Sequence, residues 1–162
     1  MKFNEEIPMK LIQAAVFFCI ATFGSNSFAQ EVTPARQTAD AWLAAYQAQD
    51  FDVARTLLTE ASTFIDPTSF GREGFGDPIN WTGADSIIAG ISSWGLDEAE
   101  YTFNRVYESP GRVVYDGSVL VTYQNGARFN YPIISIVTVE NGHLVEHRDY
   151  TDFDGATRID NQ

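Results

Sequence analysis

The chain has 162 residues, of which 22 are aspartate or glutamate and 10 are lysine or arginine, so its formal net charge at pH 7 is −12. This charge repels phosphate groups, and we therefore expect neither nucleic acid nor an anionic membrane surface as a partner. The single cysteine, Cys19, lies in a segment that we expect to be cleaved off, which excludes disulfides and thiol chemistry in the mature domain.

Residues 1–29 are predicted to be a secretory signal peptide. An apolar run from Leu11 to Phe23 follows Lys10, and the small residues Ser27 and Ala29 come after it, in the pattern that a signal peptidase recognises. The run is too short to span a bilayer, so we expect no membrane attachment after cleavage; a retained anchor is the alternative. The rest of the chain, residues 30–162, is then a single domain, secreted or periplasmic.

Short helices are expected in the first half of this domain. Thr33 and Pro34 are typical of a helix start, and apolar side chains at helical spacing predict a helix to about Gln49. The elements that follow are a short helix begun by Asp50 and reaching Leu58, a strand over residues 62–66, a long glycine-bearing loop over 68–80, and a third helix over 83–91.

The second half is expected to consist of strands. These run over residues 101–107, 113–123, 129–139 and 143–153, with turns at Pro110-Gly111, Asn125-Gly126 and Glu140-Asn141-Gly142, and a frayed tail over 154–162. Helices first and antiparallel strands last are typical of an α+β fold.

The two last hairpins decide which side chains share a face of this sheet. A three-residue loop in the last hairpin places Ser135 opposite His147 and Ile133 opposite Asp149, and a two-residue turn in the hairpin before it places Asp116 opposite Ser135. We therefore expect all five on the inner face, although a one-residue slip in either hairpin would move Asp116 to the outer face.

The candidate catalytic residues are Asp66, Asp149 and His147. In an apolar pocket, Asp149 alone or paired with His147 could act as a general base, and a structural hydrogen-bonded pair is the alternative. Asp66 precedes a proline, so a role in the turn is its alternative. Ser135, His147 and an aspartate also have the composition of a nucleophilic triad, but nothing indicates a nucleophile turn or an oxyanion hole.

Further residues are candidates for the wall of a pocket, where core and cavity wall would be the same surface. The candidate ligand-binding residues are Trp42, Tyr46, Phe64, Trp81, Asp116, Ile133 and Ser135. The two histidines are four residues apart on one strand, about 13 Å, which is too far for one metal ion. We expect no metal and no cofactor.

Several segments occur in an order found in a known family. They are a Trp-bearing helix, QAQDFDVARTLL, a strand ending in FIDP, a loop leading to WTGADSI, and the closing strand VEHRDYTDF. This order resembles the nuclear transport factor 2-like superfamily, and within it the SnoaL-like domains, over roughly residues 33–153. The resemblance implies a cone-shaped fold, in which a curved antiparallel sheet wraps around N-terminal helices and encloses an apolar cavity. The superfamily hosts enzymes, binding proteins and adaptors, so the fold alone does not give the function.

Two enzymes of the superfamily, ketosteroid isomerase and limonene epoxide hydrolase, are similar only in part. Asp66 matches the general base of the isomerase, but the isomerase's oxyanion-hole tyrosine falls at Trp42 and its protonated aspartate falls near Ser135. Asp149 matches one carboxylate of the hydrolase's Asp-Arg-Asp set, whose arginine and second aspartate are not matched. Neither catalytic set is intact.

The expected function is the binding of a small hydrophobic molecule, with carboxylate-assisted proton transfer or hydrolysis as the chemistry that the pocket would allow. The alternative is a non-catalytic binding or protein-interaction module with a filled cavity. We also expect a homodimer, because the helices cover only one face of an antiparallel sheet. The outward candidates for its interface are Ile134, Ile136, Thr138, Arg148 and Tyr150.

Overall fold

The structure, a computed structural model, describes residues 32–72 and 77–159, and the predicted signal peptide lies outside these residues. The chain divides into two units, residues 1–30 and residues 31–162, and the second unit is the domain described below. Within the described ranges, none of the helices has the length and apolar character needed to cross a membrane.

Three α-helices form the N-terminal side of the domain, as expected. They are α1 (Pro34–Gln47), α2 (Phe51–Thr56) and α3 (Ala84–Ser92), and a 3-10 turn, η1 (Pro67–Ser69), follows the first strand. The side chain of Thr33 accepts a hydrogen bond from the backbone N–H of Arg36, and Asp50 caps α2 in the same way through Val53. These caps satisfy backbone donors that the first turn of each helix leaves free.

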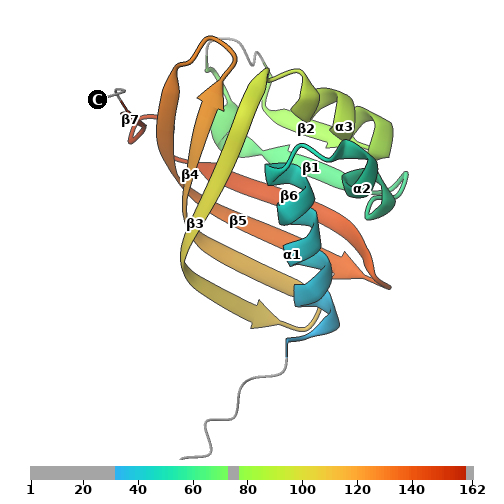
Figure 1. Cartoon of the computed structure of the whole chain (residues 1–162). Helices are drawn as coiled ribbons and strands as arrows, with labels where there is room; N and C mark the ends of the chain where they lie inside the picture. Colours follow the sequence, from blue (N-terminus) through green and yellow to red (C-terminus); the bar gives the residue numbers. More distant parts are fainter. Residues whose placement is uncertain (1–31, 73–76, 160–162) are drawn as a thin grey trace, which may run out of the picture. The chain divides into compact units, whose positions relative to one another are not determined.

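A single curved sheet forms the rest of the domain (Figure 1). Its strands are β1 (Thr63–Asp66), β2 (Ile79–Thr82), β3 (Leu96–Ser109), β4 (Arg112–Tyr123), β5 (Arg128–Glu140), β6 (His143–Thr151) and β7 (Thr157–Arg158). The order is β2-β1-β6-β5-β4-β3, and β7 pairs with β5. The expected α+β fold is confirmed, with two short strands, β2 and β7, that the sequence analysis took for a loop and a tail.

One pairing makes the sheet mixed rather than purely antiparallel. Strand β1 lies parallel to β6, with Phe64 opposite His147, while its other edge pairs antiparallel with β2. This pairing joins the helical side of the domain to its last long strand. It also brings the end of β1, at Asp66, next to the end of β6.

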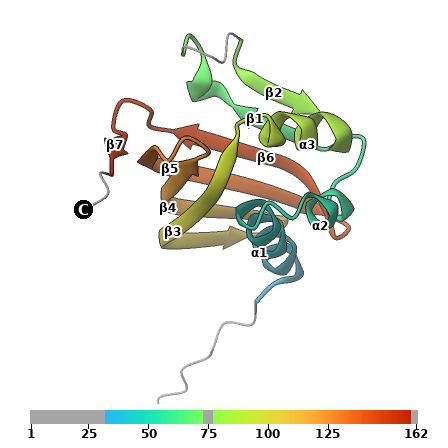
Figure 2. The ribbon, with the colours of Figure 1, turned by 45° about the horizontal axis from the view of Figure 1, so that its top comes forward.

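The core lies between α1 and the concave face of the sheet, which curves around this helix (Figure 2). Trp42 on α1 and Phe64 on β1 are fully buried there, together with Val113 and Val137 from the middle strands. Burial of such side chains is the main stabilising contribution to the fold.

The hairpin between β4 and β5 has a longer loop than expected. The backbone N–H of Tyr123 donates to the carbonyl of Ala127 at 2.9 Å, and that of Gly126 donates to the carbonyl of Tyr123 at 2.8 Å. Gly126 has a φ of 79°, so the loop is a turn closed by a left-handed glycine, with three residues instead of two.

The extra loop residue shifts the pairing of β4 with β5 by one position. Tyr115 lies opposite Ser135, and Asp116 lies opposite Ile134, a side chain exposed on the outer face. The expectation that Asp116 shares the inner face with Ser135 is therefore wrong, because a shift of one residue turns every side chain to the other face. Asp116 does not belong to the site.

The hairpin between β5 and β6 also differs, but its two differences cancel in their effect on side-chain direction. Asn141 and Gly142, with φ values of 51° and 78°, form a two-residue loop, and a bulge follows Thr138. The pairing is shifted by two residues, so Ser135 lies opposite Asp149 and not opposite His147. All three side chains still lie on the inner face, where they are buried.

A glycine allows the sheet to bend sharply. At Gly117 on β4, a Cβ atom would lie 2.0 Å from the carbonyl oxygen of Thr102 on β3. The register of the two strands shifts at the same place, between Phe103 and Arg105. Only glycine permits this close approach of two backbones, which gives the sheet its curvature.

We expect Gly117→Ala to lower the free energy of unfolding by about 1–3 kcal/mol, because the new methyl group must push the β3 backbone away. Urea unfolding followed by circular dichroism measures this change. Ser118→Ala, at the next position on the outer face, is the control and should change stability by less than about 0.5 kcal/mol. Equal unfolding midpoints for Gly117→Ala and the parent would contradict the role of Gly117.

Candidate ligand-binding site

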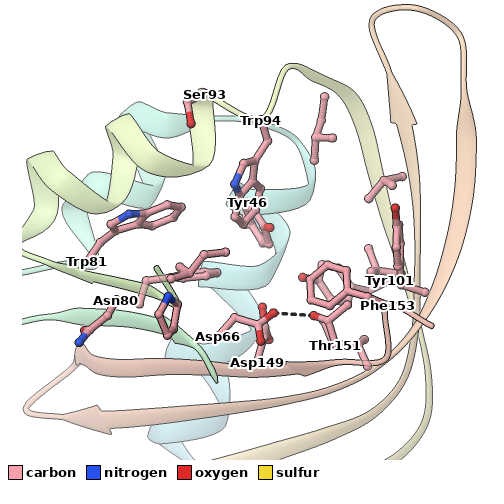
Figure 3. Close-up of a pocket in the computed structure, with 18 of the residues that line it drawn as sticks. Tyr46, Asp66, Asn80, Trp81, Ser93, Trp94, Tyr101, Asp149, Thr151 and Phe153 are labelled. Atoms are coloured by element: carbon pink, nitrogen blue, oxygen red, sulfur yellow. Dashed lines mark hydrogen bonds between the residues drawn. The ribbon is translucent and has the colours of Figure 1, made fainter. Parts of the chain in front are cut away.

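A pocket of about 710 Å³ opens on the concave side of the domain. The segments β1, β2 and the end of α3 form one side of it, and β3, β4 and β5 form the other, with Tyr46 contributed by α1 (Figure 3). The cavity is therefore open, and aromatic side chains such as Tyr46 and Phe64 line it without filling it. A cavity of this size accommodates a small organic molecule.

Eight of the twenty residues in the wall of the pocket are aromatic. Its aromatic residues are Tyr46, Phe64, Trp81, Trp94, Tyr101, Tyr123, Tyr131 and Phe153. The ring centroids of Trp81 lie 5.5 Å from those of Phe64 and 5.7 Å from those of Trp94, so these rings support one another. On α3, a Cβ at Gly90 would lie 2.5 Å from the Trp81 ring, and only glycine lets the indole lie against the helix.

Two aspartates lie close together on the floor of the pocket, Asp66 from the end of β1 and Asp149 from β6 (Figure 3). Both residues are only 4% exposed. The Oδ1 atom of Asp66 accepts from the backbone N–H and the hydroxyl of Thr68, and Oδ2 accepts from the hydroxyl of Thr151 at 2.8 Å. Asp66 therefore stabilises the turn that follows β1, which was the alternative role expected for it. It also lines the pocket.

Burial raises the pKa of the Asp66 carboxyl above its usual value, and the negative charge of Asp149 raises it further. The hydrogen bonds from Thr68 and Thr151 act in the opposite direction, because they stabilise the charged form. Asp66 therefore holds a proton to a higher pH than an exposed aspartate does.

Two side chains hold the Oδ1 atom of Asp149 in place. The hydroxyl of Ser135 donates to its Oδ1 at 2.5 Å, and Nε2 of His147 lies 2.7 Å from the same oxygen. The other oxygen, Oδ2, makes no hydrogen bond within the described part of the chain and is not enclosed by protein, so it faces the pocket. One oxygen of Asp149 is fixed, and the other is available to a ligand.

The protonation of His147 follows from its second neighbour. The indole N–H of Trp42 lies 2.7 Å from Nδ1 of His147, and an indole can only donate. Nδ1 must therefore accept, which places the imidazole proton on Nε2, where it is donated to Asp149. His147 is a neutral imidazole in this arrangement, and not the protonated partner of Asp149 that its pairing with a carboxylate could suggest.

Tyr46 and Tyr101 are two of the four tyrosines that line the pocket. Burial, and the negative charge of Asp149 with it, raises the pKa of the Tyr46 phenol well above 10. Burial raises the pKa of Tyr101 in the same way, with Tyr46 and then Asp149 as further causes. Both phenols are therefore protonated at any physiological pH, and because their hydroxyls also interact with each other, one of the two O–H groups is left to donate to a ligand.

The residues predicted for the site fall into three groups. Those that line the pocket are Asp66, Asp149, Tyr46, Phe64, Trp81 and Ile133. Three others, Trp42, Ser135 and His147, are fully buried and do not line the pocket. Asp116 lies on the outer face, as described above.

The sequence analysis missed much of the opposite wall. Tyr101 from β3, Tyr123 from β4 and Tyr131 from β5 face the pocket, and so does Trp94, which follows α3. Alternation along β4 and β5 could have assigned these tyrosines to one face, but not to the pocket, because the bend at Gly117 decides what lies opposite them.

The family assignment follows from a match over most of the domain. The family described as the SnoaL-like domain matches residues 39–147, well over half of the chain. The chain belongs to the SnoaL-like family. No curated protein sequence matches it. The family and the open apolar pocket together support a small-molecule-binding domain.

Solved structures show the same fold as this SnoaL-like domain. A candidate SnoaL-like polyketide cyclase from Shewanella putrefaciens CN-32 is 21% identical, with a TM-score of 0.66 over 76% of this chain and 93% of that one. The Δ5-3-ketosteroid isomerase from Mycobacterium sp. is 16% identical, with a TM-score of 0.68 over 79% and 100% of the two chains. An epoxide hydrolase of M. tuberculosis, similar to limonene epoxide hydrolase, is 20% identical, with a TM-score of 0.59 over 75% and 85%. The predicted resemblance is confirmed at the level of the fold.

We expect Trp42→Phe to lower the free energy of unfolding by about 1–3 kcal/mol, because Nδ1 of His147 would lose its buried donor. In the parent, ¹⁵N spectra of the imidazole should show a proton on Nε2 and none on Nδ1. In Trp42→Phe, His147 should no longer be restricted to this tautomer. A protonated Nδ1 in the parent would contradict the assignment, and Trp94→Phe is the control that leaves the imidazole signals unchanged.

Proposed function

We propose that this SnoaL-like domain binds a small, largely apolar molecule in its pocket and that Asp149 accepts a proton from it. The observation that carries the proposal is the Oδ2 atom of Asp149, a nearly buried carboxylate oxygen that faces an open aromatic cavity without a hydrogen bond. Support also comes from the solved relatives, which are described as a polyketide cyclase, a ketosteroid isomerase and an epoxide hydrolase, all enzymes of small organic molecules.

The surroundings of Asp149 suit a general base. Ser135 and His147 donate to Oδ1, which stabilises the carboxylate and fixes its orientation before a ligand arrives. Oδ2 would then take a proton from a carbon or water positioned in the cavity. Neither donor has to change its position during this step.

The other polar groups of the pocket would act on the oxygen of the bound molecule. Tyr46 and Tyr101 are protonated phenols, because burial raises the pKa of both. A carbonyl or epoxide oxygen that accepts a hydrogen bond from one of these groups is polarised, and negative charge that develops on it is stabilised. The base comes from β6, and the two donors come from α1 and β3.

We further propose that the domain acts outside the cytoplasm as a homodimer. The predicted signal peptide supports export to the periplasm or beyond the cell. On the outer face of the sheet, Ile134 and Tyr150 lie opposite each other on β5 and β6 and are 43% and 40% exposed. Such neighbouring apolar side chains suit the centre of an interface between identical subunits.

We expect Asp149→Asn to fold like the parent, because the amide oxygen can still accept from Ser135 and His147, but to lose turnover by about 100-fold or more. The assay incubates the protein with hydrophobic carbonyl compounds and epoxides and follows binding by tryptophan fluorescence and products by chromatography. Asp66→Asn should lower turnover as well, because the amide nitrogen cannot replace the carboxylate oxygen that accepts the hydrogen bond of Thr151.

The control for these variants is Asp97→Asn, which removes one exposed charge outside the pocket. It should match the parent in binding and turnover. If Asp149→Asn binds and reacts like the parent, proton transfer by Asp149 is excluded. Ligand binding without turnover in the parent would identify a non-catalytic binding protein.

The mature domain should sediment as a dimer at about 100 µM, and Ile134→Glu should make it a monomer, because two like charges would face each other across the symmetry axis. Analytical ultracentrifugation measures both. Val53→Glu, which places the same charge on an exposed apolar position of α2 and not on the outer face of the sheet, should remain a dimer. Sedimentation of the parent as a monomer would exclude the proposed assembly.

A further inference from the structure

The charged side chains that line the pocket all have the same sign. Asp66, Asp77 and Asp149 contribute carboxylates, and no lysine, arginine or histidine belongs to the described lining. The net charge of the chain, −12, produces a potential of the same sign. An anionic group is therefore repelled from this pocket, and a cation is attracted to it.

Asp149 has no positively charged partner in the described part of the chain. The indole of Trp42 keeps His147 a neutral imidazole, and the second donor, Ser135, is a neutral hydroxyl. The Oδ2 atom remains without a hydrogen bond although the residue is only 4% exposed. A buried carboxylate usually has a cationic partner, and here the open side of Asp149 is the pocket itself.

The same is true of Asp66, whose donors are the neutral groups of Thr68 and Thr151. At the rim, the Arg72 guanidinium lies 5.5 Å from the ring of Phe153, but both of its contacts with Asp154 are 2.7 Å long. The charge of Arg72 is thus already paired, and Arg72 does not line the pocket.

The aromatic wall adds a second attraction for a cation. Trp81 and Trp94 stand on the side of the pocket above the two carboxylates, and Tyr46 lies between them and Asp149 (Figure 3). The faces of such rings carry partial negative charge and attract organic cations. A cation beside the carboxylates that also contacts the face of one of the aromatic rings would be attracted by both.

The chemistry of the wall also limits what kind of cation fits. A metal ion needs several oxygen, nitrogen or sulfur ligands, and the described residues contain no group of three His, Cys, Asp or Glu side chains that could hold one. A guanidinium or primary ammonium donates several hydrogen bonds, whereas of the four carboxylate oxygens of Asp66 and Asp149 only Oδ2 of Asp149 has no donor in the described part of the chain. A tertiary ammonium donates a single hydrogen bond, which Oδ2 of Asp149 can accept, and a quaternary ammonium donates none.

We infer that the molecule bound in this pocket carries a tertiary or quaternary ammonium group, which lies beside Asp149 and Asp66 with its apolar substituents against the aromatic lining of the pocket. The inference rests on the proposed function, since it requires a small molecule in the pocket. It adds the charge of that molecule, which a purely apolar cavity would not specify.

The experiment compares two probes of the same shape, phenyltrimethylammonium and tert-butylbenzene, which differ only in a charged nitrogen or a neutral carbon. Binding to the parent is measured by calorimetry and by tryptophan fluorescence. The cation should bind at least about tenfold more tightly than the neutral probe. Asp149→Asn and Asp66→Asn should each remove most of this preference by weakening the cation alone, whereas Asp97→Asn, with the same loss of net charge, should keep it.

Each other outcome overturns the inference. Equal or tighter binding of tert-butylbenzene shows a pocket for neutral molecules and leaves the proposed function standing. An equal preference in the parent and in both pocket variants shows that the net charge alone attracts the cation. Binding of neutral carbonyl compounds or epoxides without binding of phenyltrimethylammonium also rejects the cation. Failure of every probe in the parent excludes the proposed function together with the inference.

Discussion

The hydrogen bond from the indole of Trp42 to Nδ1 of His147 is the interaction on which the site depends. It joins α1 to β6 in the fully buried centre of the domain, where a missing partner would be costly. Because an indole cannot accept, the bond has one direction only, and it fixes the direction of the next bond, from Nε2 to Asp149. A side chain that never reaches the pocket thus determines which oxygen of Asp149 does.

Two carboxyl groups without a positively charged partner lie in this otherwise apolar region. Asp66 and Asp149 are nearly buried and close to each other, and their donors are all uncharged. A core selected only for stability would avoid such a pair, because desolvating a carboxylate is unfavourable. Its presence at the floor of an open cavity is typical of a site where stability is given up for binding or chemistry.

The sequence predicts the local features of this fold well and the distant ones poorly. Helix starts, strand order and the inner position of His147 and Asp149 follow from caps and from alternation, which act over a few residues. The position of Asp116 does not, because an Asn-Gly pair fits a loop of either two or three residues. A difference of one residue there decides the face on which every later side chain of the strand lies.

The pocket as a whole could not be predicted from the sequence, for two physical reasons. Trp42 and His147 are 105 residues apart, and no local pattern indicates that their nitrogen atoms meet. The tyrosines of the far wall reach the cavity because the sheet bends at Gly117, where two backbones approach each other. Curvature of this kind depends on contacts between strands, and a single strand carries little sign of it.

The parallel pairing of β1 with β6 has a consequence for when the pocket can form. Asp66 and Thr151, which bond across this pairing, are 85 residues apart, and β6 is the last long strand of the chain. Hairpins such as β3–β4 close short loops, whereas the β1–β6 pairing must close a long one, which is slower. During synthesis, therefore, the helices and the first hairpins can assemble while the binding site is still absent. Ligand binding begins only with the completed chain, so a ligand that binds the native state stabilises the final step of folding and none of the earlier ones.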